Sequence, residues 1–212
     1  MSSQFRYGMK KILVCATRNR KKVEELRPLL EPLGYVLRTI EEEAPGVRTV
    51  EDGDTFAANA EKKALAVHVA TGHATLADDS GLEVDALGGA PGVHSARYAA
   101  GPSDEGHDDG ANNQKLLAAL DKTPDAQRTA RFRCALAFVT DGGSLITADG
   151  TCEGSILRAP RGDGGFGYDP LFVPTGDTRT FAELPLDAKN QISHRRRALD
   201  ALVAKLKGSS SG

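Results

Sequence analysis

The sequence predicts an α/β protein with a mixed β-sheet and flanking helices. Two observations carry this prediction. Apolar strand-like runs alternate with helix-like segments in the first half of the chain, and two long alternating runs follow one another across a short turn in the second half. Strands separated by helices usually pair in parallel and strands joined by a tight turn pair antiparallel, so both kinds of pairing are expected.

The first half alternates between strands and helices. Pro28 lies inside the first expected helix and should kink or shorten it, because its ring removes a backbone donor. Asp54 can cap the second helix, and Gly72 can end it. In order, we expect a buried strand at 11–16, a helix at 19–33, a strand at 35–40, an acidic loop at 41–53, a helix at 54–71, a strand at 74–79 and a further strand at 82–87.

The second half predicts a helix, a hairpin and a closing helix. The helix is expected at 112–121. Alternating apolar residues at 131–139 and 144–157 predict two long antiparallel strands joined across an Asp-Gly-Gly turn. Ser193 can cap the last helix, whose inward face should carry Ala198, Leu199, Leu202, Val203 and Leu206.

Length and charge exclude several classes of protein. A chain of 212 residues fits one domain, here residues 10–207 between tail-like ends at 1–9 and 208–212. The 27 basic and 29 acidic side chains give a net charge of −2, so no general field draws the chain to nucleic acid or an anionic membrane. No apolar run approaches the ~20 residues of a membrane span, and the polar N-terminus has no signal-peptide core. Any anion binding must therefore rest on a local cluster.

Cysteine usage favours a cytoplasmic protein with free thiols. Cys15, Cys134 and Cys152 are odd in number, widely spaced and placed in apolar or strand-like runs. They form no Cys-x-x-Cys pair, which argues against both a disulfide framework and a zinc site. We expect all three to be buried.

Two clusters in the first third of the chain could bind phosphate and metal. Residues 16–22 join the first strand to a helix start, where backbone N–H groups attract phosphate and four basic side chains add charge. These cations oppose the helix dipole, so they cost stability unless an anion is present; a solvated basic helix start is the alternative. Asn59 and Lys63 share a helix face just after Glu51, where the alternative is an acidic loop followed by a surface helix.

Asp78 and Asp79 form a third cluster at the end of an apolar strand. In an extended strand they face opposite ways, so only one of them can point into a given site. Carboxylates in this position suit Mg²⁺, together with substrate phosphate oxygens. An Asp-Ser-Gly turn is the alternative interpretation.

Two clusters in the second half could recognise a base. In residues 162–170 four glycines surround two aromatic residues, so the backbone can approach a flat ligand and the phenylalanine can stack on it; a plain hairpin loop is the alternative. Lys189 precedes Ser193–Arg197, where three arginines open a helix although its dipole disfavours cations there. His194 and Arg195 can donate hydrogen bonds to carbonyl oxygens. The alternatives are a solvated basic face or a nucleic-acid patch, but no aromatic residues interleave with the charges.

These clusters, in this order, resemble the motifs of the inosine triphosphate pyrophosphatase family, also called dITP/XTP pyrophosphatases, which remove non-standard purine nucleotides. The resemblance covers about residues 11–206. Arg18 and Lys21 depart from it, because many members carry glycine at the first position and often at the second. The matching motifs are Ala-Thr-x-Asn-x-x-Lys (16–22), Glu-x-Gly-x-Thr-Phe with Asn59-Ala60 (51–60), Ala-Asp-Asp-Ser-Gly-Leu (77–82), Gly-Gly-Ala-Pro-Gly-Val-x-Ser-Ala-Arg-Tyr (88–98), Gly-Gly-Phe-Gly-Tyr-Asp-Pro (164–170) and Ser-His-Arg (193–195).

The resemblance implies an elongated, ITPase-like fold with two lobes around a nucleotide cleft, usually in a homodimer. It implies that ITP, dITP and XTP are hydrolysed to the nucleoside monophosphate and pyrophosphate, with Mg²⁺ as cofactor. Glu51 and Asp79 would bind the Mg²⁺, and Asp79 would also be the general base; Asp78, which faces the other way, should matter less for chemistry. The implied substrate-binding residues are Thr17, Asn19, Lys22 and Lys63 around the triphosphate, Ser80, and Phe166, Gly167, Tyr168, Asp169, Lys189, His194 and Arg195 on the base and phosphate side.

The residue chemistry agrees with this implication. Cleavage of the α–β phosphoanhydride needs an in-line water, a base and neutralisation of the leaving pyrophosphate, which carboxylates, metal and lysines can supply. Hypoxanthine and xanthine carry a carbonyl at C6 where adenine carries an amino group. Donors on His194, Arg195 or the backbone would pair with the carbonyl oxygen. The amino group of adenine would leave these donors unpaired, which costs ~1–3 kcal/mol per donor. Guanine shares the C6 carbonyl and must be rejected at C2.

Three other functions stay open at this point. A nucleotide sensor of the same fold would bind without turnover, although its carboxylates would then be idle. A nucleic-acid binder would use Arg195–Arg197, against a net charge of −2. A related pyrophosphatase would act on pyrimidine or modified nucleotides.

Overall fold

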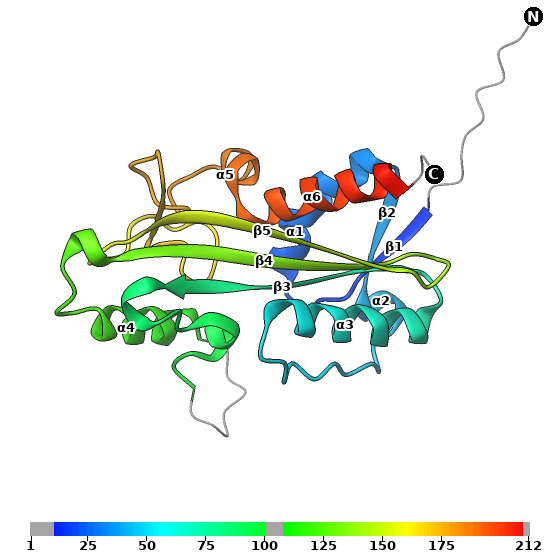
Figure 1. Cartoon of the computed structure of the whole chain (residues 1–212), viewed down its shortest axis with the longest axis horizontal. Helices are drawn as coiled ribbons and strands as arrows, with labels where there is room; N and C mark the ends of the chain where they lie inside the picture. The colour runs from blue at the N-terminus through cyan, green and yellow to red at the C-terminus, as the bar shows by residue number, and fades with distance from the viewer. Residues whose placement is uncertain (1–10, 101–107, 210–212) are drawn as a thin grey trace, which may run out of the picture.

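A six-stranded sheet extends along the long axis of the molecule (Figure 1). The computed structural model describes residues 11–100 and 108–209, so the expected tail at 1–9 and residues 210–212 lie outside the described residues. The strand order is β2-β1-β3-β4-β5-β6. The strands are β1 (Lys11–Cys15), β2 (Tyr35–Thr39), β3 (Ala74–Val84), β4 (Thr129–Val139), β5 (Leu145–Ile156) and β6 (Phe172–Pro174).

The sheet is mixed, as the sequence predicts. β1 pairs in parallel with both β2 and β3, which helical segments separate from it along the chain. The pairs β3–β4, β4–β5 and β5–β6 are antiparallel, and the β4–β5 hairpin turns at the expected Asp-Gly-Gly. The α/β class with a mixed sheet is therefore confirmed.

Helices cover both faces of the sheet. In Figure 1, α1, α5 and α6 lie on one side, and α3 and α4 lie on the other. Each face is sealed by its own cluster of buried apolar side chains, and a third cluster rich in phenylalanine fills the end near β6. The helices are α1 (Arg20–Leu30), α2 (Ile40–Glu43), α3 (Phe56–Thr71), α4 (Asp109–Ala119), α5 (Leu186–Ile192) and α6 (His194–Ser209).

β3 is longer than expected, and this positions the site. A single strand covers Ala74–Val84, so the Asp-Asp-Ser-Gly segment is extended throughout. A Cβ at Gly81 would lie 2.4 Å from the Ser95 Oγ, because the 3₁₀ turn Gly92–Arg97 packs directly on the strand. Glycine is needed here for that close approach, and the interpretation of this segment as a turn is wrong.

Other expected boundaries shift by a few residues. Thr55, not Asp54, caps α3, since its Oγ1 accepts a hydrogen bond from the Ala58 N at 3.1 Å. Pro28 lies in the last turn of α1, which ends at Leu30 and is followed directly by a 3₁₀ turn at Glu31–Leu33. The acidic loop contains α2, α6 extends to Ser209, and neither α5 nor β6 was expected.

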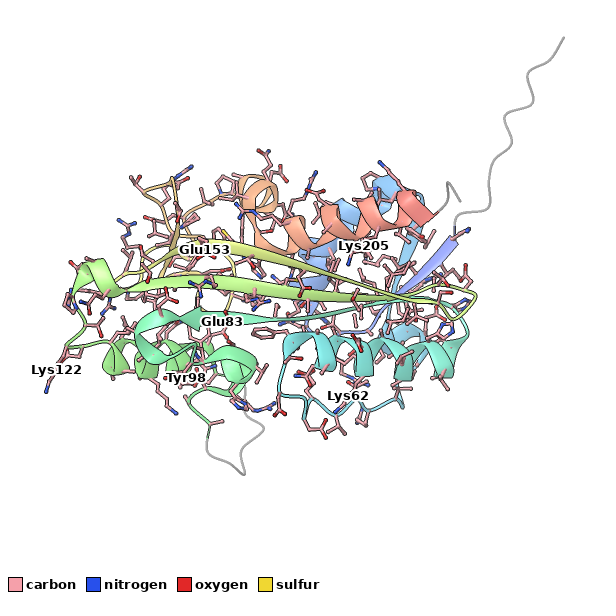
Figure 2. All side chains as sticks on the ribbon, viewed as in Figure 1. Lys62, Glu83, Tyr98, Lys122, Glu153 and Lys205 are labelled. Atoms are coloured by element: carbon pink, nitrogen blue, oxygen red, sulfur yellow. The ribbon has the colours of Figure 1, made fainter. Side chains whose placement is uncertain are left out.

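Charged side chains on neighbouring strands pair with one another on one side of β3, β4 and β5. Figure 2 shows Glu83 on β3 and Glu153 on β5, with β4 between them. Arg131 lies 3.1 Å from the Glu153 carboxylate and 2.9 Å from that of Asp85, and Arg133 lies 3.6 Å from Glu83. Each such exposed pair contributes at most ~1 kcal/mol, so their main effect is to keep this face solvated.

The expectation for the thiols is confirmed. Cys15, Cys134 and Cys152 are free and buried. Within the described ranges, every helix is too short or too polar to cross a membrane.

Candidate active site

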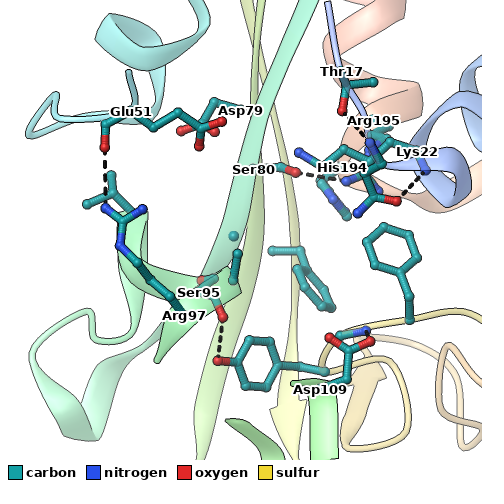
Figure 3. A pocket seen from close by; sticks show the side chains of 18 of the residues that line it. Thr17, Lys22, Glu51, Asp79, Ser80, Ser95, Arg97, Asp109, His194 and Arg195 are labelled. Carbon is teal, nitrogen blue, oxygen red and sulfur yellow. Dashed lines mark hydrogen bonds between the residues drawn. The ribbon is translucent and has the colours of Figure 1, made fainter. Parts of the chain in front are cut away.

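A cleft of about 260 Å³ opens against β3 and β4, and Figure 3 shows side chains that line it. Every site residue expected from the sequence lines this cleft except Lys189, which lies behind Phe166 with its Nζ 5.2 Å from the ring centroid. Segments far apart in the chain meet here. The lining residues are Thr17, Arg18, Asn19, Lys22, Glu51, Lys63, Asp79, Ser80, Gly81, Val93, Ser95, Ala96, Arg97, Asp109, Phe132, Phe166, Gly167, Tyr168, Asp169, His194 and Arg195.

The turn before α1 leads into a helix start whose dipole is not neutralised by an acidic side chain. Asn19 caps the helix: its side chain accepts from the Lys22 N at 3.2 Å, and its own N donates to the Thr17 Oγ1 at 3.2 Å. The first turn of α1 has no acidic residue, so no side chain there neutralises the positive end of the helix dipole. Such a helix start binds phosphate readily.

Lys63 and two carboxylates form a second part of the site. The Lys63 Nζ lies 2.8 Å from the Asp79 Oδ1 and 3.4 Å from the Glu51 Oε1. The Asn59 Nδ2 donates to the Asp79 Oδ2 at 3.2 Å, and the Asn59 Oδ1 accepts from the Gly53 N at 2.8 Å. One side chain of α3 therefore connects the loop that carries Glu51 to β3.

Burial and charge shift the pKa values in this group. Burial opposes the charge of Lys63, but Asp79 and Glu51 outweigh it and raise the pKa of the ammonium group. Burial also raises the pKa of the Asp79 carboxyl, with the Lys63 charge opposing it. A raised pKa makes the Asp79 carboxylate a stronger base than an exposed one.

The donor set fits one hard divalent cation. Glu51 and Asp79 both contact the Lys63 ammonium, so the protein already favours positive charge at this point. Across residues 11–100 and 108–209, no group of three or more His, Cys, Asp and Glu side chains could hold a metal ion. Two carboxylates suit Mg²⁺ when substrate phosphate oxygens and water complete its coordination.

Asp78 faces away from Asp79, as expected, but it is not idle. Its carboxylate is fully buried and accepts hydrogen bonds from Lys22, from the Arg195 Nε at 3.0 Å and from the Ser80 Oγ at 3.0 Å. Burial opposes its charge, but Arg195 and Lys22 outweigh burial and hold the pKa of Asp78 well below its ordinary value. Asp78 therefore orients Lys22 and Arg195, the two cations expected to bind substrate, and this role is not apparent from the sequence.

The glycine-rich loop presents Phe166 to the cleft. The Asp169 Oδ2 accepts from the Phe166 N at 2.9 Å, and Gly165 and Gly167 adopt positive φ values of 69° and 60° on either side of it. The Asp109 Oδ2, at the start of α4, accepts from the Gly167 N at 2.7 Å. These bonds hold the aromatic ring at one end of the cleft, as a stacking platform requires.

His194 has an unused hydrogen-bonding atom. It is 2% exposed and stacks on Phe132 with 4.9 Å between ring centroids. Its Nδ1 is buried and has no hydrogen-bond partner among residues 11–100 and 108–209. Burial, reinforced by the Arg195 charge, lowers the pKa of His194 well below 6.5, so the imidazole is neutral. Leaving such an atom unpaired costs ~1–3 kcal/mol, which a polar ligand would recover.

Arg195 is held on three sides. Besides the bond to Asp78, its Nη1 donates to the Glu25 Oε2 at 2.6 Å and its Nη2 donates to the Ser80 Oγ at 2.8 Å. Bonds to described residues commit three of its five N–H groups, and the other two remain for a ligand. Arg196 and Arg197 instead bond to Asp200 and to the Thr151 O, so the basic run supplies one side chain to the cleft, not three.

No site role is expected from the sequence for Glu25, for Arg18, which departs from the family motif, or for Arg97, which lies in the motif at 88–98. Glu25 follows Lys22 by three residues, a spacing that places both on one helix face and could have revealed it. The Arg18 Nη2 donates to the Pro45 O at 3.1 Å and to the Val47 O at 2.8 Å, and the Arg97 Nη2 donates to the Glu51 O at 3.3 Å. Their acceptors are backbone atoms of distant loops, for which a sequence gives no signal.

The chain matches known proteins over nearly all of its described length. A model of the Ham1 family matches residues 13–205. A dITP/XTP pyrophosphatase of Desulforamulus reducens is 57% identical over 188 residues, which cover 88% of this chain and 91% of that protein. A dITP/XTP pyrophosphatase of Bacillus subtilis is 48% identical over 189 residues, which cover 89% and 93%.

Solved structures share the fold. The Ham1 protein of Staphylococcus aureus superposes with a TM-score of 0.81 at 38% identity, covering 94% of this chain and 100% of that one. A nucleoside-triphosphatase / dITP/XTP pyrophosphatase from Mycobacterium abscessus gives a TM-score of 0.71 at 45% identity, covering 90% and 98%. The expected ITPase-like fold is thereby confirmed.

Proposed function

The chain belongs to the Ham1 family, and on that premise we propose that it is a nucleoside triphosphate pyrophosphatase that removes non-standard purine nucleotides. Its proposed substrates are ITP, dITP and XTP, its products are the monophosphate and pyrophosphate, and its cofactor is Mg²⁺. Relatives named dITP/XTP pyrophosphatase, at up to 57% identity, support the reaction class. The observation that supports it most is one cleft that combines the Glu51–Lys63–Asp79 group with a helix start and an unpartnered buried imidazole.

Asp79 is the proposed general base. Asn59 and Lys63 hold its carboxylate from the α3 side, so its remaining lone pairs can accept a proton from the attacking water. Glu51 and Asp79 would hold the Mg²⁺, which when bound neutralises charge on the phosphates and on the leaving pyrophosphate. Lys63 is buried beside both carboxylates and would stabilise the same developing charge.

The helix starts bind the two ends of the nucleotide in this proposal. The N–H groups at the start of α1, with Thr17, Asn19 and Lys22, take the triphosphate. At the other end the base stacks on Phe166. The Nδ1 of His194 and the two uncommitted N–H groups of Arg195 donate to the C6 carbonyl, where the amino group of adenine would leave them unpaired.

Product analysis tests the reaction. With ITP and Mg²⁺ we expect IMP and pyrophosphate in equal amounts, measured by ion-exchange chromatography. IDP with orthophosphate would overturn the assignment. Tight ITP binding without products would favour the sensor, and duplex affinity with a steep salt dependence would favour the nucleic-acid binder.

A substrate panel tests the base selectivity. We expect kcat/KM for ITP, dITP and XTP to exceed that for ATP, GTP and TTP, with the Arg195→Ala variant losing much of the ITP/ATP difference. TTP as the best substrate would favour the pyrimidine alternative. The family resemblance further leads us to propose a cytoplasmic homodimer, which size-exclusion chromatography with light scattering tests for assembly.

A further inference from the structure

Glu25 is a buried carboxylate that lies behind the cleft. It is on α1, is 3% exposed and does not line the cleft. Each of its oxygens contacts a different cation: Oε1 lies 2.6 Å from the Lys189 Nζ, and Oε2 lies 2.6 Å from the Arg195 Nη1. Three helices, α1, α5 and α6, therefore meet at this one carboxylate.

The two cations also meet at the aromatic ring proposed to stack on the base. The Lys189 Nζ and the Arg195 guanidinium carbon each lie 5.2 Å from the Phe166 ring centroid. Two like charges gathered around one half-buried ring repel each other unless an anion lies between them. Glu25 is that anion, and Arg195 and Lys189 together outweigh its burial and lower the pKa of Glu25.

Glu25 and its neighbours form a series in which acidic and basic side chains alternate and their charges cancel. Asp169 contacts Lys189 at 2.5 Å, and Asp78 contacts the Arg195 Nε at 3.0 Å, so Glu25 is the central anion between two outer ones. Asp169 also fixes the Phe166 backbone N. In order, the series is Asp169, Lys189, Glu25, Arg195, Asp78 and Lys22, with three charges of each sign.

A purely structural role is the competing explanation. Apolar side chains usually hold helices together as well as a buried ion pair does, so stability alone does not require this arrangement. Both partners of Glu25 converge on Phe166, and Arg195 adjoins the unpartnered His194. The carboxylate therefore sets the position of groups at the base end, not only the packing of helices.

We propose that Glu25 is a positioning residue for base recognition. Its carboxylate holds Lys189 and Arg195 in place around Phe166, while it touches neither the nucleotide nor the reacting atoms. This inference rests on the proposed function, because it names the group that orients the base-reading side chains of that same cleft.

Three variants test the role. Glu25→Gln keeps the shape and removes the charge, Glu25→Asp keeps the charge with shorter reach, and Glu24→Gln is the matched control, since Glu24 is the exposed neighbour on the same helix. Calorimetry without metal measures Kd for IMP and for AMP, and kinetics with ITP separates KM from kcat. Circular dichroism confirms folding and gives Tm.

We expect Glu25→Gln to raise the Kd for IMP about tenfold or more and to lower the ratio of the Kd for AMP to the Kd for IMP. In the kinetics with ITP, KM should change more than kcat. Glu25→Asp should lie between the wild type and Glu25→Gln, and Glu24→Gln should match the wild type.

A folded Glu25→Gln protein with wild-type Kd values for both ligands overturns the positioning role, even if its Tm falls. If Glu25→Gln does not fold, Glu25→Asp decides: a wild-type AMP/IMP ratio there overturns the role in the same way. If the wild type hydrolyses ITP and the Glu25 variants keep its AMP/IMP selectivity, the positioning role of Glu25 is refuted and the proposed function stands. A wild-type protein inactive on ITP refutes the proposed function as well.

Discussion

His194 and Arg195 are neighbours in sequence, yet their surroundings give them different properties. Arg195 is surrounded by acceptors and keeps its charge although it is buried. His194 stacks on an aromatic ring beside that charge, so it stays neutral and keeps a free Nδ1. In the tautomer that carries its hydrogen on Nδ1, the neutral imidazole can donate next to a fixed cation, which suits recognition of a carbonyl oxygen.

We expect the His194 imidazole to stay neutral from about pH 8 to about pH 6, because burial and then Arg195 lower its pKa well below 6.5. A ¹H–¹⁵N NMR titration should show no shift of its ring nitrogens, assigned with a His194→Asn variant. Since the unfolded chain takes up a proton below its pKa of 6.5 and the folded chain does not, this group should lower the stability as the pH falls through 6.5 and have no effect above it. A titration midpoint near 6.5 in the folded protein would refute this.

The carboxylates should separate by role. We expect Asp79→Asn to lose ~10²–10⁴-fold in kcat, because the base is lost and metal binding weakens. Glu51→Gln should recover part of its activity at high Mg²⁺, since its carboxylate acts through the metal. A Mg²⁺ titration of kcat checks both, and a folded Asp79→Asn variant that keeps more than about a tenth of wild-type kcat would end this assignment.

In contrast to Asp79→Asn, which removes the general base, we expect Asp78→Asn to lower the stability of the protein. Its loss leaves Lys22 and Arg195 without their shared anion, and breaking such a buried pair costs ~3–5 kcal/mol. Urea unfolding measures this cost. Wild-type stability in Asp78→Asn would show that the pairing does not hold the two cations.

At the scale of elements, the start of α6 is positioned by the close approach of its backbone to β5. A Cβ at Gly150 would lie 2.2 Å from both the Ala198 N and the His194 O. Only glycine leaves room for this contact, which brings β5 against the first turn of α6, where His194 and Arg195 lie. We therefore expect a change in this contact to displace both side chains.

We expect Gly150→Ala to destabilise the fold by at least ~1–3 kcal/mol, because backbone atoms must move apart. The displaced α6 should also raise KM for ITP. Gly142→Ala in the β4–β5 turn is the control, since the nearest atom to its added Cβ would be 3.8 Å away. Equal free energies of unfolding for the two variants, measured in urea, would contradict the close-contact argument.

At the scale of the whole molecule, basic side chains from different helices gather at the cleft. The starts of α1 and α6 both carry basic residues where the helix dipole disfavours them, and neither has an acid in its first turn. Buried carboxylates compensate part of this charge, and an anionic ligand should compensate more. Substrate binding is therefore coupled to the stability of the whole fold.

We expect ITP in EDTA, which prevents turnover, to raise Tm by about 5–10 °C at a hundredfold excess over Kd. Inosine, which has the base without phosphates, should raise Tm much less at the same concentration. Differential scanning calorimetry measures both. Equal shifts would show that phosphate charge is not what stabilises the protein.

Local patterns were enough to predict the architecture and most of the cleft. Period-2 and period-3.6 apolar spacing identified most of the strands and helices, because these patterns depend on neighbouring residues only. Motif order then identified the family and residues such as Asn19, Asp79 and Phe166, all of which line the cleft. The opposite orientation of Asp78 and Asp79 also followed from the strand period alone.

Tertiary structure alone decided how the charges are paired. Asp78 holds Lys22 and Arg195, Glu25 joins Lys189 to Arg195, and Arg18 bonds to a distant loop. The continuity of β3 likewise rests on tertiary structure, because its residues from Thr75 to Val84 pair with β4, which lies about 50 residues further along the chain. A buried charge is stable only where its opposite lies within a few ångströms, and that distance is set by segments up to 170 residues apart along the chain. The sequence by itself determined most of the polar side chains that line the cleft, because they lie in recognisable motifs, whereas the fold decided which of them hold one another, which stay free for a ligand and which further residues join them.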